Sequence, residues 1–194
     1  MRDYIIMTDS CCDLSQQEVE ELDLTVLPLS FTIEGKTLLN TPDHADLSPE
    51  EFFKKIAEGA DCTTAAVNVG QFTDAMEKVL DEGKDILCIC FSSALSTTYQ
   101  SACIAASDLR EKHPGAKIIV IDSLSASRGQ GMLLYRTVRE RREKGLDIDA
   151  LASYVDSIIQ SQDHWFFVDD LNHLKRGGRV SATAALVGTM LGIK

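Results

Sequence analysis

An uninterrupted apolar run at residues 86–91 is followed directly by a segment, 92–101, in which six of ten side chains are serine or threonine. An apolar run without polar alternation is typical of a strand that is buried on both faces of a parallel sheet. The small residues of 102–106 then continue as a helix. The hydroxyls therefore lie where a parallel strand ends and a helix begins, which is where open α/β sheets bind ligands.

The same alternation of apolar runs and amphipathic stretches recurs along the chain and predicts an α/β fold, a mostly parallel sheet with flanking helices. Strands are expected at 4–8, 24–29, 31–33, 86–91, 117–121 and 165–168. Helices are expected at 14–22, 49–59, 98–112, 129–144, 149–160 and 182–193, and one more begins after Asn68. Segments 60–67 and 171–179 are expected to form a loop and a basic, glycine-bearing turn.

The formal net charge of −11 makes nucleic acid a poor partner, so none is expected, and contact with anionic membranes is expected to be only transient. The six cysteines form no C-x-x-C pair and the four histidines show no ligand spacing, so no metal site is expected. Cys88 and Cys90 are expected to share one face of their strand. The N-terminus does not resemble a signal peptide, and a cytoplasmic location is the expectation.

Polar residues follow three predicted strands at the edge where parallel strands end: Asp9 with Ser10, the hydroxyl segment 92–98, and Asp122. Hydroxyls together with the unpaired N–H groups of a helix start suit an anionic or carbonyl-bearing head group. Two acids beside serines also suit Mg²⁺ or acid/base chemistry, and the structural alternative is that they cap helices and tie loops. Ligand contact is favoured for the hydroxyls, and the structural role for the two acids.

Motifs for covalent or nucleotide chemistry are absent from the sequence. Ser96 lies in no G-x-S-x-G turn, and no histidine is placed to act as its base. Neither G-x-x-x-x-G-K-[ST] nor G-x-G-x-x-G occurs, so nothing indicates a P-loop or a dinucleotide fingerprint. The basic run 175–179 is either a solvated turn or a small cationic patch for an acidic partner or a phosphate.

Five short motifs follow one another along the chain. They are T-D-S-C-C-D-L at 8–14, T-A-A-V-N-V-G-Q-F at 64–72, S-S-A-L-S-T-T-Y-Q-S-A at 92–102, I-D-S at 121–123 and L-K-R-G-G-R-V at 174–180. In this order they resemble the motifs of the DegV family of bacterial fatty-acid-binding proteins, and the resemblance covers all 194 residues. The third motif is the most specific, since it is similar to the family pattern S-S-x-L-S-G-T-Y-Q-S-A.

The resemblance implies that the protein binds a long-chain fatty acid, such as palmitate, stearate or oleate, and uses no other cofactor. It implies that a threonine and a serine hold the carboxylate, and these fall on Thr64 and Ser96. The hydroxyls of Ser93, Thr97 and Ser10 are further candidate contacts. An acyl tail also needs a dry apolar tunnel, because each buried methylene contributes roughly 0.8 kcal/mol.

The resemblance further implies that the protein has no catalytic activity of its own. It would present the carboxylate to a separate, ATP-dependent fatty acid kinase, which phosphorylates it. Arg179 resembles a residue of the family segment near the pocket mouth and the kinase surface, so it is a candidate partner contact.

Two departures from the family pattern matter. Residues 65–68 replace a commoner S-Q-P-S, which removes polar side chains beside Thr64 and gives Ser96 more of the expected carboxylate contact. Family members also continue beyond this chain, so it is expected to be truncated. Residues 1–164 would form the N-terminal α/β domain with the carboxylate site, and 165–194 would begin a C-terminal α/β domain.

Two other functions stay open at this point. The protein would be a metal-assisted phosphoryl-transfer or hydrolytic enzyme if Asp9, Asp122 and the serine loop carried the chemistry. It would be a regulatory or interaction module if ligand binding had been lost with the C-terminal part.

Overall fold

The computed structural model describes residues 2–168 and 171–192, with only the backbone of His173. The chain falls into two compact units, 1–162 and 163–194. No helix among the described residues has both the length and the apolar character that a membrane crossing requires.

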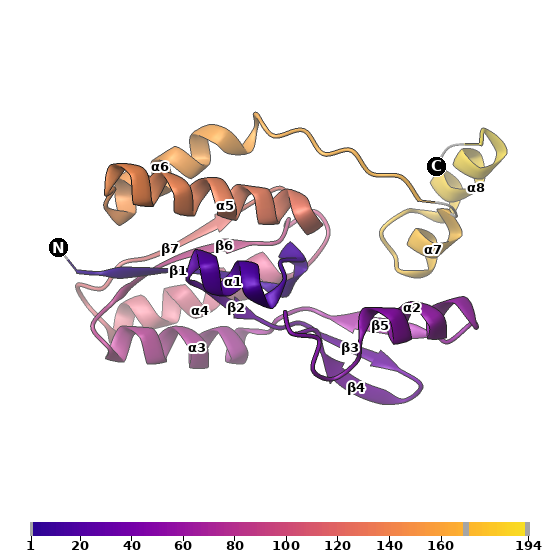
Figure 1. The fold of residues 1–194 in the computed structure, drawn as a ribbon, viewed down its shortest axis with the longest axis horizontal. Helices are drawn as coiled ribbons and strands as arrows, with labels where there is room; N and C mark the ends of the chain where they lie inside the picture. The colour runs from indigo at the N-terminus through magenta and orange to yellow at the C-terminus, as the bar shows by residue number, and fades with distance from the viewer. Residues whose placement is uncertain (1, 169–170, 193–194) are drawn as a thin grey trace. The chain divides into compact units, whose positions relative to one another are not determined.

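A four-stranded parallel sheet forms the centre of the first unit (Figure 1). Its strands are β1 (Tyr4–Asp9), β2 (Leu24–Leu27), β6 (Asp85–Cys90) and β7 (Ile118–Asp122), in the order β2-β1-β6-β7. Every residue of β6 is buried, as its unbroken apolar run predicts. The expected α/β class with a parallel sheet is therefore confirmed.

Helices cover both faces of this sheet, because successive side chains of a strand point to opposite sides. They are α1 (Gln16–Leu22), α3 (Val69–Asp81), α4 (Thr98–Lys112), α5 (Ser127–Lys144) and α6 (Ile148–Ile159). Leu87 and Ile89 of β6 share one core with residues of α1, α5 and α6, while Cys88 and Cys90 share the other with α3 and α4. The Cys88 and Cys90 sulfurs lie 3.6 Å apart, which confirms that the two share one face.

Capping residues determine where the helices begin. Three caps in the first unit, Ser15, Ser48 and Asn68, each accept the N–H three residues on. Two helices start earlier than predicted. Helix α5 begins at Ser127 rather than at 129, and α6 is preceded by Asp147, whose carboxylate accepts the N–H of Ala150. Asp149, the predicted start of α6, lies in its first turn.

A three-stranded antiparallel sheet, not predicted from the sequence, lies in the same unit together with α2 (Pro49–Ala57). Its strands, in the order β4-β3-β5, are β3 (Ser30–Ile33), β4 (Lys36–Leu39) and β5 (Cys62–Ala65). The prediction of a loop at 60–67 is wrong, because Thr63 and Thr64 pair with Thr32 and Phe31 of β3. The side chains of this edge strand are mostly exposed, so the sequence lacks the apolar signal of a buried strand.

In the described part of the second unit there are two helices, α7 (Leu171–Arg176) and α8 (Ala182–Met190). Segment 171–179 therefore begins as a helix and turns only afterwards, at Gly178 with a φ of +75°. The strand predicted at 165–168 is not formed. Its three aromatic side chains are exposed, and no strand pairs with it in the described part of the chain. An apolar run becomes a strand only through hydrogen bonds to a neighbouring strand.

Candidate functional site

A cavity of about 710 Å³ lies in the first unit, and its walls come from several parts of the chain. They are the short helix η1 (Ser10–Cys12) with the start of α1, the antiparallel sheet with α2, the residue after β6, and the start of α5. A volume of this size falls within the roughly 300–1,000 Å³ that small-molecule sites occupy. The fold therefore offers one roomy site where the parallel and antiparallel sheets meet.

Much of the cavity wall is apolar and aromatic. The residues concerned are Leu14, Leu29, Phe31, Leu39, Pro42, Leu47, Pro49, Phe52, Phe53, Phe91 and Ala126. Phe52 meets both Phe31 and Phe53 edge to face, with ring centres 5.4 Å apart in each pair. No residue of α2 is fully buried, and Phe53 is 67% exposed although it lines the cavity. An apolar ligand would cover aromatic surface that the protein itself leaves open.

Two of the predicted site residues, Ser10 and Thr64, line this cavity. Ser10 is 5% exposed, and its Oγ accepts hydrogen bonds from the N–H of Leu29 (3.0 Å) and from Asn40 Nδ2 (3.4 Å). Both bonds use oxygen lone pairs, so the hydroxyl proton remains to be donated, and the described residues provide no acceptor for it. Thr64 lies on β5 opposite Phe31 of β3. Asn40, which belongs to no motif in the sequence, lines the cavity as well.

The other three predicted hydroxyls lie on the loop between β6 and α4 and do not line this cavity. Ser96 Oγ accepts the N–H of Thr98 at 3.2 Å and lies 2.9 Å from its hydroxyl oxygen, so Ser96 supports the start of α4. Ser93 is held through its backbone N–H, and Thr97 is exposed. The structure thus brings Ser10 and Thr64 to one cavity and leaves Ser93, Ser96 and Thr97 on the adjoining loop.

Asp9 and Asp122, the acids at the ends of β1 and β7, both accept backbone hydrogen bonds. Asp9 accepts from the N–H of Cys11 (3.1 Å) and the N–H of Phe91 (2.7 Å). Asp122 accepts two N–H groups at 3.1 Å, one of them from Ser93. Burial raises the pKa of the Asp9 carboxyl above its ordinary value, and the two N–H donors act in the opposite direction. Each acid therefore ties neighbouring loops at the sheet edge.

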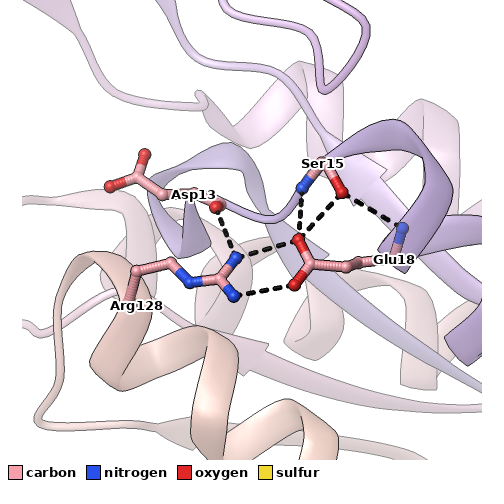
Figure 2. Close-up of polar contacts among 4 residues, drawn as sticks. All are labelled: Asp13, Ser15, Glu18 and Arg128. Atoms are coloured by element: carbon pink, nitrogen blue, oxygen red, sulfur yellow. Dashed lines mark hydrogen bonds and ion pairs between the residues drawn. The ribbon is translucent and has the colours of Figure 1, made fainter.

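A charged network lies where the starts of α1 and α5 line the cavity (Figure 2). Arg128 holds the Glu18 carboxylate through two bonds, Nη1 to Oε2 at 2.9 Å and Nη2 to Oε1 at 2.7 Å. Arg128 Nη1 also donates to the carbonyl oxygen of Asp13 at 3.0 Å. The Ser15 N–H and hydroxyl donate to Glu18 Oε2 at 2.8 and 2.9 Å. The S-x-x-E spacing signals the Ser15–Glu18 contact, but no sequence pattern predicts Arg128, which lies 110 positions away.

The Glu18–Arg128 pair predicts a defined acid dependence of stability. Arg128 and Ser15 lower the pKa of Glu18 from 4.5 to about 2. Because the folded-state pKa is depressed, the ionised carboxylate stabilises the protein above pH 4.5, and this stabilisation is lost as the pH falls towards 2. In urea unfolding across that window, we expect the stability of the wild type to fall more steeply than that of Glu18→Gln. Because the pair is partly exposed, the difference is expected to be small and to shrink in high salt, and equal slopes at low salt would contradict the assignment.

The cysteines next to this network lack the lowered thiol pKa of reactive cysteines. Cys11 and Cys12 both line the cavity. Burial raises the pKa of both thiols, that of Cys12 to about 12, so both stay protonated at neutral pH. In residues 2–168 and 171–192, no three His, Cys, Asp or Glu side chains are grouped so as to hold a metal ion.

A family model and several known proteins match the sequence of this chain. A family model described as "Uncharacterised protein, DegV family" matches residues 4–194. A DegV domain-containing protein of Clostridium perfringens is 40% identical over 194 residues, which are 100% of this chain and 66% of the relative. A second, from Lactococcus lactis, is 41% identical over 191 residues, which are 98% of this chain and 65% of the relative. The chain thus spans slightly less than two thirds of the length of these relatives.

Two solved structures share the fold. A stearic-acid-binding protein from Eubacterium ventriosum superposes with a TM-score of 0.84 at 30% identity, covering 95% of this chain and 62% of that one. A fatty-acid-binding DegV family protein from Thermus thermophilus gives a TM-score of 0.81 at 34% identity, covering 98% and 65%. Both matches extend over nearly all of the present chain.

Proposed function

The chain belongs to the DegV family, and on that premise we propose that it binds a long-chain fatty acid whose carboxylate is held by hydroxyl groups. Palmitate, stearate and oleate are the ligands we consider. The proposal agrees with the ligands named for the two structures it resembles, a stearic acid in one and a fatty acid in the other.

The observation that carries the proposal is the cavity of about 710 Å³. Its aromatic and aliphatic wall suits an alkyl chain, since removing apolar surface from water contributes about 25 cal/mol per Å². The buried Ser10 hydroxyl has a proton to donate, and Thr64 adds a second hydroxyl. Hydrogen bonds to a carboxylate are roughly twice as strong as those between neutral groups. Apolar walls and hydroxyl donors together match an acyl chain with an anionic head.

We assign the head-group contact to Thr64 and Ser96, with Ser10, Ser93 and Thr97 as further candidates. Thr64 and Ser10 are supported by their place on the cavity. Ser96, Ser93 and Thr97 belong to the loop that starts directly after Phe91, which itself lines the cavity. A carboxylate at the end of the cavity nearest this loop would also lie close to the start of α4, which favours an anion.

We propose that the protein is a carrier without catalytic activity of its own. Asp9 and Asp122, the residues on which a metal-assisted enzyme would depend, each accept two backbone N–H groups. These bonds support a structural use of both carboxylates. Hydroxyl donors bind a carboxylate without activating it, so binding followed by presentation is the simpler function.

The partner and cellular setting belong to the same proposal. We infer a cytoplasmic protein that presents the bound carboxylate to a separate ATP-dependent fatty acid kinase and touches membranes only transiently. Arg179 is the candidate kinase contact, since it and Lys175 are both exposed in a chain whose net charge is −11. Residues 1–164 would carry the carboxylate site, and 165–194 would begin the second domain.

Mass spectrometry of protein purified without denaturant tests the binding proposal. We expect a co-purified acid of palmitate, stearate or oleate mass, released on denaturation, at a stoichiometry approaching one per chain. Delipidated protein should take up stearic acid again. A protein that carries no acid and does not bind stearic acid after delipidation would refute the proposal, and turnover of a phosphorylated substrate with Mg²⁺ would favour the enzyme instead.

A further inference from the structure

The side chains of Glu18 and Arg128 join the start of α1 to the start of α5 at the cavity wall (Figure 2). We propose that this pair, the latch, closes the cavity between these two helices, and that its opening is a step in the release of a bound fatty acid. The release step rests on the proposed function. The closure itself concerns the protein without a ligand and can be tested by itself.

The latch has a more favourable hydrogen-bond arrangement than an ordinary surface ion pair. Exposed pairs usually contribute little unless an arginine and a carboxylate meet through two parallel bonds, as Arg128 and Glu18 do. Ser15 fixes the carboxylate from the other side, and the Asp13 carbonyl fixes the guanidinium. The depressed pKa of Glu18 keeps the pair ionised throughout the physiological range.

Other contacts of α5 with η1 and α1 do not involve the two latch residues. A Cβ on Gly131 of α5 would lie 2.9 Å from the carbonyl oxygen of Cys12, which shows how closely α5 approaches η1. At the far end of α1, Arg142 Nη2 donates to the carbonyl oxygen of Glu21 at 2.6 Å. The Arg142 contact holds the two helices together at the far end of α1 when the latch is broken. Opening is therefore confined to the helix starts, next to the cavity.

The backbone before Arg128 favours such a local opening. Ser127 has a φ of +51° and Leu124 a φ of +49°, a left-handed conformation that residues with a Cβ rarely adopt. Unfavourable backbone conformations persist only where surrounding contacts hold them in place. Leu124 and Ser125 are also held by hydrogen bonds to Asp122, Ser123 and Ser92, which do not involve Arg128. The Arg128 bonds to Glu18 and Asp13 hold the start of α5, so losing them allows Ser127 to relax away from the cavity.

Two cysteines report on opening and on unfolding separately. Cys12 lines the cavity close to the latch and is 1% exposed, so a thiol reagent reaches it when the cavity opens. Cys88 lies at the centre of the parallel sheet and is 0% exposed, so it reacts only when the sheet unfolds. The ratio of the two labelling rates therefore measures local opening.

The experiment labels the delipidated chain with N-ethylmaleimide and follows each cysteine by peptide mass spectrometry. Arg128→Met is expected to speed labelling of Cys12 about fivefold and to leave Cys88 unchanged, which corresponds to loss of one good ion pair. Glu18→Gln should give a smaller increase, since glutamine still accepts the Ser15 N–H. Arg128→Lys should fall between wild type and Arg128→Met, because lysine cannot form the two parallel bonds.

The matched control is Glu143→Gln, which breaks the exposed ion pair with Arg139 (2.7 Å) on α5, away from the cavity. It should leave Cys12 labelling unchanged. Removing the positive charge of Arg128 disfavours the nearby thiolate and by itself slows labelling. Faster labelling in Arg128→Met therefore reports opening, not a change in thiol acidity.

Unchanged Cys12 labelling in Arg128→Met would overturn the closure, and so would a parallel rise at Cys88, which would indicate general destabilisation.

The release step is tested by repeating the measurement with stearic acid and by the dissociation rate of a fluorescent stearic acid analogue. We expect about fivefold faster dissociation from Arg128→Met. An unchanged dissociation rate would overturn the release step alone. If stearic acid neither binds nor slows Cys12 labelling in the wild type, the proposed function and the release step are both wrong. The closure is then tested only by the Cys12 and Cys88 labelling rates of the ligand-free protein.

Discussion

Stearic acid is expected to bind the delipidated protein at least about a hundredfold more tightly than lauric acid, which has six fewer methylenes. Each fully buried methylene contributes about 0.8 kcal/mol, so six contribute about 5 kcal/mol at most. The open edges of the cavity reduce this value, and about 2.7 kcal/mol already corresponds to a hundredfold change in dissociation constant. Competition with a fluorescent fatty acid or isothermal titration calorimetry measures the two constants.

Stearic acid methyl ester is the control for the head group, since it keeps the chain and loses the charge. It should bind more weakly than the free acid but more tightly than an equally uncharged lauric ester. Equal affinity for stearic and lauric acids would show that the apolar cavity wall does not hold the chain. The aromatic cluster of Phe31, Phe52 and Phe53 would then need another role.

Replacing Thr64 by valine is expected to weaken stearic acid binding about 10- to 100-fold, because a hydrogen bond to a charged group contributes about 1.5–3 kcal/mol. Valine keeps the shape and the β-branched character of threonine, so β5 should stay paired with β3. Thr63→Val is the matched control, since Thr63 lies on the same exposed strand and does not line the cavity. The affinity for the methyl ester should change far less than that for the acid.

Ser96→Ala tests the second proposed contact and needs a stability measurement beside it. Ser96 also supports the start of α4 by accepting the Thr98 N–H, so alanine removes a helix contact whether or not a ligand binds. A loss of affinity that exceeds the loss of unfolding free energy would support head-group contact. If both Thr64→Val and Ser96→Ala left the affinity for stearic acid unchanged, the assignment of the head-group site would be wrong.

Elements with a strong local signal were predicted from the sequence. Strand β6 was recognisable because all its residues are apolar except the first, and α4 because its limits are marked by hydroxyl residues and by Pro114. Strands β4 and β5 were not, since their side chains are mostly exposed and their pairing partners determine them. The apolar run at 165–168 was predicted to be a strand but does not form one, because an apolar sequence alone does not provide a neighbouring strand to pair with.

The same distinction between local sequence signals and contacts of distant residues applies to the candidate site. Ser10 and Thr64 could be named because each lies in a recognisable motif, whereas Asn40 lines the same cavity without belonging to one. Glu18 carried the local signal of a capping box and nothing that indicated a cavity. Arg128 could not have been identified, since its role depends entirely on a residue 110 positions earlier.

By itself, the sequence determined the α/β class, the hydroxyl segment between a buried strand and a helix, and the family resemblance. These depend on periodicity and on neighbours within a few positions, which are properties of the local chain. Only the tertiary structure decided that Ser10 and Thr64 share one cavity while Ser96 stays on the adjoining loop, and that Glu18 and Arg128 meet beside it. Crossover connections bring distant segments together at a sheet edge, and the distances there result from the packing of the whole domain.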